Sequence, residues 1–184
     1  MKKPYVIGIG GGTCSGKSTL ANQLAEAMYD FHPVMIHMDA YYIRPLTYTV
    51  APITGKTYCE MNHPDALNLA KLKEDFLAAV QNPEQKLVVI EGLFALYLPE
   101  ILEHLDLKIF VDLKSDERLV RRIKRHMANG DTFEEVTDRY LDTVRYRHDE
   151  LVEPTRWRAD MVFNGTLAGK ELDILTTYLR SQLS

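Results

Sequence analysis

Residues 11–18 read Gly-Gly-Thr-Cys-Ser-Gly-Lys-Ser, and this stretch decides the fold. It matches the pattern Gly-x-x-x-x-Gly-Lys-[Ser/Thr] at every fixed position. Residues 5–10 before it form a short apolar run typical of a buried strand. Residues 19–28 after it have helical periodicity, with Leu20, Leu24 and Ala27 on one face. Strand, glycine-rich loop and helix, in this order, form the context in which the pattern binds phosphate.

Each residue type in the loop has a physical reason to be there. Glycines allow backbone N–H groups to point inward around an anion, and the helix N-terminus adds partial positive charge. Lys17 can reach the outer phosphates of a nucleotide, and the Ser18 hydroxyl can ligate Mg²⁺. The predicted nucleotide-binding residues of the loop are Gly11, Gly12, Thr13, Cys14, Ser15, Gly16, Lys17, Ser18 and Thr19.

The bulk composition indicates a soluble globular protein. The 184 residues suit one domain, 1–184, and contents of 46% hydrophobic and 26% charged residues are ordinary. A net charge of −4 gives no support for nucleic acid or an anionic membrane as the main partner. No apolar run reaches the roughly 18 residues of a membrane span. Cys14 and Cys59 form neither a disulfide framework nor a metal spacing, so we expect a cytoplasmic protein.

Apolar runs alternate with helix-like segments along the chain. Because the runs do not alternate polar and apolar residues, they predict a five-stranded parallel sheet covered on both faces, a three-layer α/β/α fold. The predicted strands are 4–10, 33–38, 86–91, 107–112 and 159–163, and the predicted helices are 17–29, 66–81, 115–128, 132–149 and 169–182. The stretch from Tyr42 to Pro64 has no periodicity, and a loop of that length is usually functional.

Acidic residues follow three of the predicted strands. Ligands of open α/β sheets bind beyond the carboxyl ends of the strands, which draws attention to Asp39, Glu91 and Asp112. Asp39 and Glu91 should lie near the phosphate loop if the second and third strands adjoin the first. Phosphoryl transfer needs Mg²⁺ and a group that orients or deprotonates the attacking oxygen, roles that such carboxylates can supply. We expect Asp112 and Ser115 to shape a loop and cap the next helix instead.

The predicted helix 115–128 has an arginine-rich face. Arg118, Arg121, Arg122 and Arg125 recur at three- and four-residue spacing. A solvated charged face is one interpretation. The other is a helical lid, about 115–148, whose guanidinium groups bind phosphate, and we predict that Arg121, Arg122 and Arg125 include nucleotide ligands. Asn129-Gly130 then serves as helix stop and hinge.

The segment 62–66 leaves two alternatives open. Asp65 can cap the helix that begins at Ala66, and His63 is either a packed loop residue or part of a substrate pocket.

The chain resembles the uridine kinase / phosphoribulokinase family of P-loop kinases, and within it the uridine–cytidine kinases. The resemblance covers nearly the whole chain and is far more specific than the phosphate loop alone. It rests on GGTCSGKST at 11–19, DAYY at 39–42, NHPDA at 62–66, EGLFAL at 91–96, FVDLKSDERLVRRIKR at 110–125 and YLDTVRYRHDELVEPTRWRAD at 140–160.

The resemblance implies ATP-dependent phosphorylation of a hydroxymethyl group, typically the 5′-hydroxyl of a ribonucleoside. Asp39 falls where the family has its catalytic base, and Lys17, Ser18 and Glu91 fall at phosphate and Mg²⁺ positions. The catalytic residues are thus predicted to be Asp39 and Lys17, with Ser18 and Glu91 at the metal. The predicted substrate residues are Asp39, Tyr42, Asn62, His63 and Arg122. The resemblance also suggests self-association.

Three departures from the family pattern concern the acceptor. Residues 66–91 have no room for the β-hairpin that reads the pyrimidine in uridine–cytidine kinases. The ribose-binding aspartate of the family is Asn62 here, and an amide bonds a diol more weakly than a carboxylate does. The lid is shorter, with Asn129-Gly130-Asp131 in place of an arginine-flanked glycine.

Three functions therefore stay open. The first is an ATP-dependent kinase of uridine or cytidine that yields the 5′-monophosphate. The second is a kinase of another small hydroxylated acceptor, such as a nicotinamide riboside kinase-like enzyme. The third is a nucleotide-binding module without turnover, against which the DAYY and HPDA segments argue because a switch needs no acceptor pocket.

Overall fold

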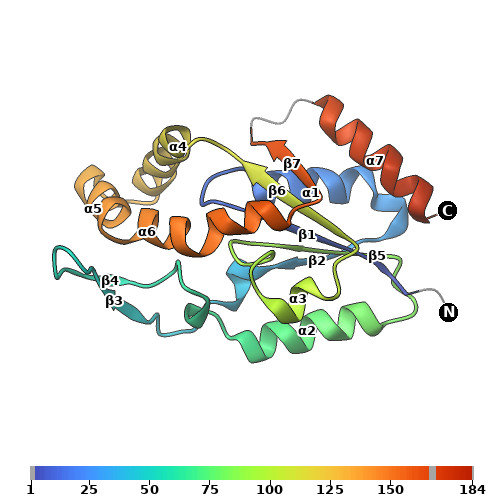
Figure 1. The fold of residues 1–184 in the computed structure, drawn as a ribbon, viewed down its shortest axis with the longest axis horizontal. Coiled ribbons are helices and arrows are strands. Elements are labelled where there is room, and N and C mark those ends of the chain that lie inside the picture. Colours follow the sequence, from blue (N-terminus) through green and yellow to red (C-terminus); the bar gives the residue numbers. More distant parts are fainter. Residues whose placement is uncertain (1–2, 166–168, 184) are drawn as a thin grey trace.

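The computed structural model describes residues 3–165 and 169–183 and has a parallel sheet at its centre (Figure 1). The strands are β1 (Tyr5–Gly11), β2 (Val34–His37), β5 (Leu87–Glu91), β6 (Leu107–Asp112) and β7 (Met161–Asn164). They pair in the order β2-β5-β1-β6-β7, all in parallel. All five predicted strands are present, which confirms the predicted α/β fold with its five-stranded parallel sheet.

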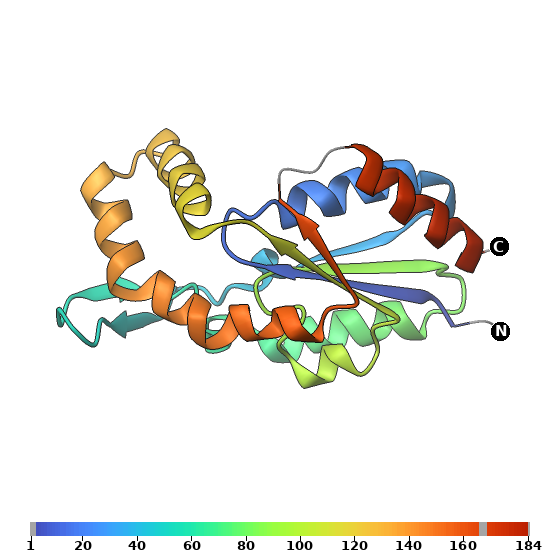
Figure 2. The ribbon, with the colours of Figure 1, turned by 45° about the horizontal axis from the view of Figure 1, so that its top comes forward.

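Helices cover both faces of the sheet. The helices α1 (Lys17–Ala27) and α7 (Gly169–Leu183) lie on one face, and α2 (Leu69–Gln81) and α3 (Pro99–Leu102) lie on the other (Figures 1 and 2). Successive residues of β1 serve the two cores in turn. Val6 packs in the α2 core with Phe76, and Ile7 packs in the α1 core with Leu24. This alternation is why the buried strands read as continuous apolar runs in the sequence.

The lid leaves the sheet after β6 and returns before β7. It begins with α4 (Ser115–Ala128), turns at Gly130 with φ 100°, and continues as α5 (Phe133–Arg139). Two π-helical turns follow, Tyr140–Val144 and His148–Val152, on either side of α6 (Arg145–Arg147), and the 3₁₀ segment Glu153–Arg158 ends the run. The predicted helix stop at Asn129-Gly130 is confirmed, because Asn129 is the C-cap of α4.

A β-hairpin occupies part of the stretch that had no periodicity in the sequence. Its strands β3 (Tyr48–Val50) and β4 (Thr57–Cys59) pair in antiparallel fashion. Tyr48 and Val50 are 70% and 63% exposed, so the hairpin has little core of its own. Its two strands project beyond the end of the sheet and lie below the lid in both ribbon views (Figures 1 and 2). The interpretation of Tyr42–Pro64 as wholly irregular was therefore wrong.

Two predicted helix caps were also wrong. Asp65 does not cap the second long helix: residues Pro64–Ala66 form a 3₁₀ turn, and α2 begins only at Leu69 with Asn68 as its cap. The Asn68 side chain accepts a hydrogen bond from the N–H of Lys71. Likewise, α4 starts after Lys114 without a side-chain cap, so Ser115 is its first residue rather than its cap.

Across the residues that the structure describes, we find no helix that is both long enough and apolar enough to cross a membrane.

Candidate active site

The loop between β1 and α1 has the backbone conformation that its glycines predict. Gly11 has φ 139° and Gly16 has φ 108°, a region that favours glycine. A Cβ atom on Gly11 would collide with the carbonyl oxygen of Val111 on the neighbouring strand. Cys14 also has a positive φ, 59°. The loop therefore curls tightly between the end of β1 and the start of α1.

Lys17 begins α1 and folds back over the loop. Its Nζ donates a hydrogen bond to the Gly12 carbonyl at 2.9 Å, and the residue is only 8% exposed. Burial lowers the pKa of Lys17, and the charges of Glu91 and Asp39 oppose that shift. The ammonium group is thus held at the loop, where it balances two nearby carboxylates and offers positive charge to an anion.

An open cavity of about 340 Å³ lies at the carboxyl end of the sheet, above this loop. The phosphate loop, the ends of β2 and β5, the segment after the hairpin and the lid all contribute to its walls. The predicted site residues that line it are Thr13, Cys14, Gly16, Lys17, Ser18, Thr19, Asp39, Tyr42, Asn62, Glu91, Arg121, Arg122 and Arg125. One cavity therefore gathers most of the predicted nucleotide, substrate and metal residues.

Glu91 forms the centre of a small polar cluster at the cavity floor. It ends β5, where it pairs with Ile9 of β1 on one side and His37 of β2 on the other. Its Oε1 accepts a hydrogen bond from the Ser18 hydroxyl at 3.1 Å and lies 2.9 Å from Nδ1 of His37. The residue is 3% exposed. The sheet order thus brings the carboxylate beside the helix start that carries Ser18.

Asp39 lies at the opening of the same floor, just after β2. Its side chain is exposed to the cavity and makes no hydrogen bond to another described residue. The surrounding protein raises its pKa by desolvation; Lys17 opposes the shift and Glu91 adds to it. β2 does not adjoin β1, because β5 lies between them. The two carboxylates still meet, because parallel strands end at one edge of the sheet.

Three lid arginines of α4 line the cavity, namely Arg121, Arg122 and Arg125. Arg122 is buried and its Nη1 donates to the Thr13 hydroxyl at 3.2 Å, whereas Arg121 donates to the Gly165 carbonyl at 3.1 Å. Burial lowers the pKa of Arg122 to about 10, so it remains charged at neutral pH. Arg118 shares the helix face but lies behind the loop, where its Nε donates to the Leu113 carbonyl.

The segment Cys59–Asn62 forms part of the cavity wall, and we call it the acceptor wall because Asn62 is a predicted substrate residue. The Tyr42 hydroxyl donates to the Met61 carbonyl at 2.6 Å. Glu60, which is buried, accepts a hydrogen bond from the Asn62 N–H at 2.7 Å. The wall is therefore tied to Tyr42 and braced within itself, and Cys59, Met61 and Asn62 all line the cavity.

Some cavity residues were not predicted. They are Cys59, Met61, Leu93, His126 and Arg139. Arg139 ends α5, and its buried Nε has no hydrogen-bond partner among the described residues. Helical periodicity gave no reason to single it out, whereas Cys59 and Met61 are close enough to Asn62 to have been suspected.

Other predicted residues lie outside the cavity lining. Gly11, Gly12 and buried Ser15 shape the loop from behind. His63 accepts a hydrogen bond from the Asp65 N–H through Nδ1, so it caps the 3₁₀ turn Pro64–Ala66. Asp112 forms an ion pair with Arg156 at 3.0 Å and its carbonyl accepts from Gly165, which agrees with the expected structural role.

The Ser18–Glu91 pair offers oxygen donors that suit Mg²⁺. This ion takes one or two protein oxygens and completes its shell with water and phosphate oxygens. In the described part of the chain, no group of three or more His, Cys, Asp and Glu residues could enclose a metal by itself. The Ser18 and Glu91 oxygens therefore fit an Mg²⁺ ion that completes its shell with water and nucleotide phosphates.

Comparisons with known proteins agree with this geometry. Residues 78–168 match the family described as phosphoribulokinase / uridine kinase. A uridine kinase from Clostridium novyi (strain NT) is 31% identical over 208 aligned residues, which cover 100% of this chain and 99% of the relative. The chain belongs to the phosphoribulokinase / uridine kinase family. Members of this family are ATP-dependent phosphotransferases that act on a hydroxyl group, and this chain is one of them.

Further relatives extend the family assignment. A uridine kinase from Alkaliphilus metalliredigens (strain QYMF) is 33% identical, with 88% of each chain covered. The solved phosphoribulokinase from Rhodobacter spheroides superimposes with a TM-score of 0.67 at 18% identity, covering 89% of this chain and 71% of that one, which supports the fold. The alignment with the Clostridium novyi family member is longer than this chain's 184 residues, so that relative has insertions that are absent here.

Proposed function

We propose that this family member transfers the γ-phosphoryl group of ATP to the 5′-hydroxyl of a nucleoside, most favourably uridine or cytidine, and so acts in nucleoside salvage. The observation that carries the proposal is the single cavity in which Lys17, Asp39 and the lid arginines face one another across the phosphate loop. Uridine kinases that match over the full chain support the nucleoside as acceptor. A cytoplasmic location is part of the same proposal.

In this mechanism the acceptor hydroxyl lies against Asp39. The carboxylate orients the hydroxyl and accepts its proton as the oxygen attacks the γ-phosphorus, and the bond from phosphorus to the bridging oxygen of ADP breaks. Its raised pKa makes it a better proton acceptor, as long as it remains ionised. No other side chain in the described part of the chain makes a hydrogen bond with this carboxylate.

The charge on the transferring group is balanced by the loop and the lid. Lys17, the loop N–H groups and Arg121, Arg122 and Arg125 supply fixed positive charge where the phosphoryl oxygens collect negative charge. When bound, Mg²⁺ would neutralise part of the phosphate charge, with Ser18 and Glu91 as its protein-side partners. Closure of the lid excludes water and suppresses hydrolysis of ATP.

A second acceptor class is favoured by one feature of the fold. Between the end of α2 at Gln81 and the start of β5 at Leu87, the chain has only a short turn. The pyrimidine-reading hairpin that the family resemblance leads one to expect there is absent, as the sequence indicated. The alternative is therefore a kinase of another small hydroxylated acceptor, such as nicotinamide riboside, with the same phosphate and base residues.

An acceptor panel tests the proposal. ADP release is measured with Mg-ATP against uridine, cytidine, nicotinamide riboside, ribose, pantothenate and glycerate, with the Asp39→Asn variant as control. Turnover with uridine or cytidine that Asp39→Asn abolishes supports the first assignment. Turnover confined to another acceptor would replace the nucleoside and keep the mechanism. ADP release that is equally fast without any acceptor would contradict both.

A further inference from the structure

One face of the hairpin carries a row of side chains that point toward the lid. Lys56, Tyr58 and Glu60 occupy alternating positions of an extended segment, so they share one face. The pairing of β3 with β4 extends over this whole segment, because Ala51 N–H donates to the Lys56 carbonyl and Glu60 N–H donates to the Thr47 carbonyl, both at 2.8 Å.

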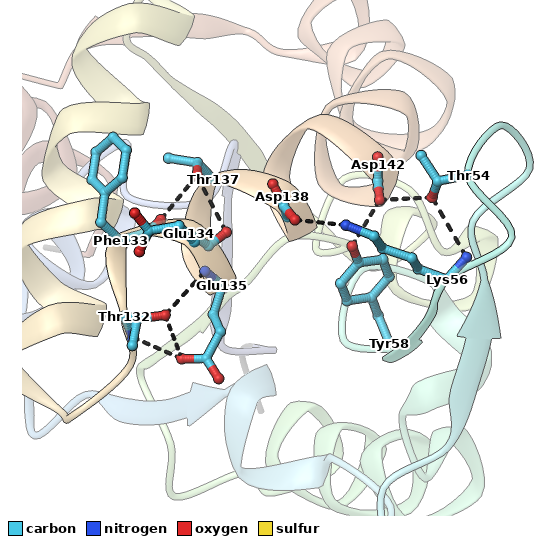
Figure 3. A network of polar contacts seen from close by, with 10 residues as sticks. All are labelled: Thr54, Lys56, Tyr58, Thr132, Phe133, Glu134, Glu135, Thr137, Asp138 and Asp142. Atoms are coloured by element: carbon cyan, nitrogen blue, oxygen red, sulfur yellow. Dashed lines mark hydrogen bonds and ion pairs between the residues drawn. The ribbon is translucent and has the colours of Figure 1, made fainter.

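Each residue of this row has a partner in the lid. Lys56 Nζ lies 2.7 Å from Asp138 Oδ2, and the Tyr58 hydroxyl donates to Asp142 Oδ2 at 2.7 Å. Figure 3 shows both contacts, together with the Thr54 hydroxyl, which donates to the same oxygen of Asp142 at 2.7 Å. Farther along, Glu60 Oε2 lies 3.5 Å from Nε of Arg147. We call the pairs Lys56–Asp138, Tyr58–Asp142 and Glu60–Arg147 the lid ladder.

The spacing of the two rows explains why they meet. Two residues of a strand advance about 6.6 Å, and four residues of an α-helix advance about 6 Å. Asp138 and Asp142 are four residues apart, so their spacing along the helix matches the spacing of Lys56 and Tyr58 along the strand. Arg147 comes five residues after Asp142, and the π-helical turn Tyr140–Val144 lies at this point. The wider π turn accommodates the extra residue.

The charges of the lid ladder define one register. Along the hairpin they run positive, neutral and negative, and along the lid they run negative, negative and positive. A shift by one step in one direction would bring Glu60 against Asp142, and a shift in the other would leave Glu60 without its cation. Glu60 is buried, so losing Arg147 would leave an uncompensated charge inside the protein.

Both rows lead directly into the cavity. On the hairpin side, the acceptor wall continues the same segment. Cys59 lies between the ladder residues Tyr58 and Glu60, and Met61 and Asn62 follow Glu60. On the lid side, Arg139 lines the cavity and is the residue after Asp138. A movement of the lid therefore displaces the acceptor wall unless the ladder breaks.

We propose that Lys56, Tyr58 and Glu60 are positioning residues that lock the acceptor wall to the lid, so that nucleotide capture by the lid sets the geometry of the acceptor site. The inference rests on the proposed function in one respect, namely that ATP binds the phosphate loop and lid arginines. It does not depend on which acceptor is used. In the proposed complex the phosphates of ATP lie at the loop and the lid, and the lid ladder connects the lid to the hairpin.

Hydrogen–deuterium exchange of the hairpin, residues 48–60, tests the proposal in four proteins: wild type, Lys56→Asp, the charge-swapped Lys56→Asp/Asp138→Lys, and Lys124→Asp. Lys124 is an exposed lid residue outside the ladder and receives the same charge change. Without nucleotide, Lys56→Asp should speed hairpin exchange by about two- to fivefold, the range that exposed ion pairs support, and the charge swap should restore it. Equal exchange in Lys56→Asp and wild type would overturn the ladder.

A second comparison adds a Mg²⁺ complex of a non-hydrolysable ATP analogue. In wild type and Lys124→Asp, the analogue should slow exchange in the hairpin as well as in residues 11–19. In Lys56→Asp, protection of residues 11–19 should persist while hairpin protection disappears, and the swap should recover it. Hairpin protection that Lys56→Asp leaves intact would refute the coupling. A wild-type loop without protection would refute the proposed ATP site, and the nucleotide-free comparison would still decide the ladder.

Discussion

Replacement of Asp39 by asparagine removes one charge and one proton-accepting group from the cavity and almost nothing else. The side chain is exposed to the cavity and makes no side-chain hydrogen bond in the described structure, so the variant should fold with the stability of the wild type. The amide keeps the shape of the carboxylate. It can still contact the acceptor hydroxyl, but it cannot take its proton.

The expected size of the effect follows from these losses. A positioned general base contributes about 10²- to 10⁴-fold to a rate, which corresponds to about 3–5 kcal/mol of barrier. ATP affinity should change little in comparison. The negative charge of Asp39 repels the phosphates across a solvated cavity by less than about 1 kcal/mol, so its loss strengthens ATP binding by a factor of about five or less.

Steady-state ADP release and direct ATP titration separate the two effects. The variant should show the fall in kcat with ATP affinity equal to or slightly above that of wild type. The pH profile gives an independent check. Because desolvation raises the pKa of Asp39, the acid limb of wild-type kcat/KM should have its midpoint above the ordinary aspartate value of about 3.9. Normal turnover in Asp39→Asn would refute the base assignment, and so would an acid limb unchanged by the substitution.

Three further perturbations test other parts of the account. Lys17→Ala removes a charged phosphate ligand, so isothermal titration should find ATP binding weakened about 10- to 100-fold; unchanged affinity would contradict the phosphate-loop assignment. In a Cys59→Ser background, ATP at about 100 times its Kd should slow thiol labelling of Cys14 by a factor approaching 100, and equal labelling rates would show that nucleotide does not cover the loop. Burial, aided by Arg118 and Lys17, lowers the pKa of His148 to about 4. The unfolded chain, with an ordinary histidine near pH 6.5, therefore takes up a proton first as the pH falls. In urea titrations, the free energy of unfolding should fall by up to about 3 kcal/mol from pH 6.5 to pH 4, and His148→Gln should make this fall smaller. If the free energy of unfolding fell equally with pH in both proteins, that would be evidence against a buried neutral ring.

The parts of the site that were predictable from the sequence are those fixed by local chemistry. The phosphate loop needs glycine where φ is positive, as at Gly11 and Gly16, so the glycines in the sequence predict the backbone conformation of the loop. The carboxyl ends of β2 and β5 carry Asp39 and Glu91, and parallel strands end at one edge whatever their order. Of these two strands, β5 adjoins β1 and β2 does not, yet both carboxylates line the same cavity.

The features that sequence reasoning missed depend on contacts between distant segments. The hairpin strands β3 and β4 have three residues each and little apolar burial, so no periodicity marks them. Their partners Asp138 and Asp142 are more than 80 residues away along the chain. Arg139 reaches the cavity from the end of α5, after the turn at Gly130 that separates α5 from α4. Asn68 caps α2, whereas Asp65 lies in the 3₁₀ turn Pro64–Ala66, which has His63 as its cap.

The most direct test of the central claim is the identity of the phosphorylated product. Wild type and Asp39→Asn are incubated with Mg-ATP and uridine or cytidine, and the product is examined by mass spectrometry and ³¹P NMR. The account predicts a nucleoside 5′-monophosphate formed in step with ADP by the wild type, and at least about 100-fold less of it from the variant. ATP that binds but leaves both nucleosides unphosphorylated would contradict the proposed function.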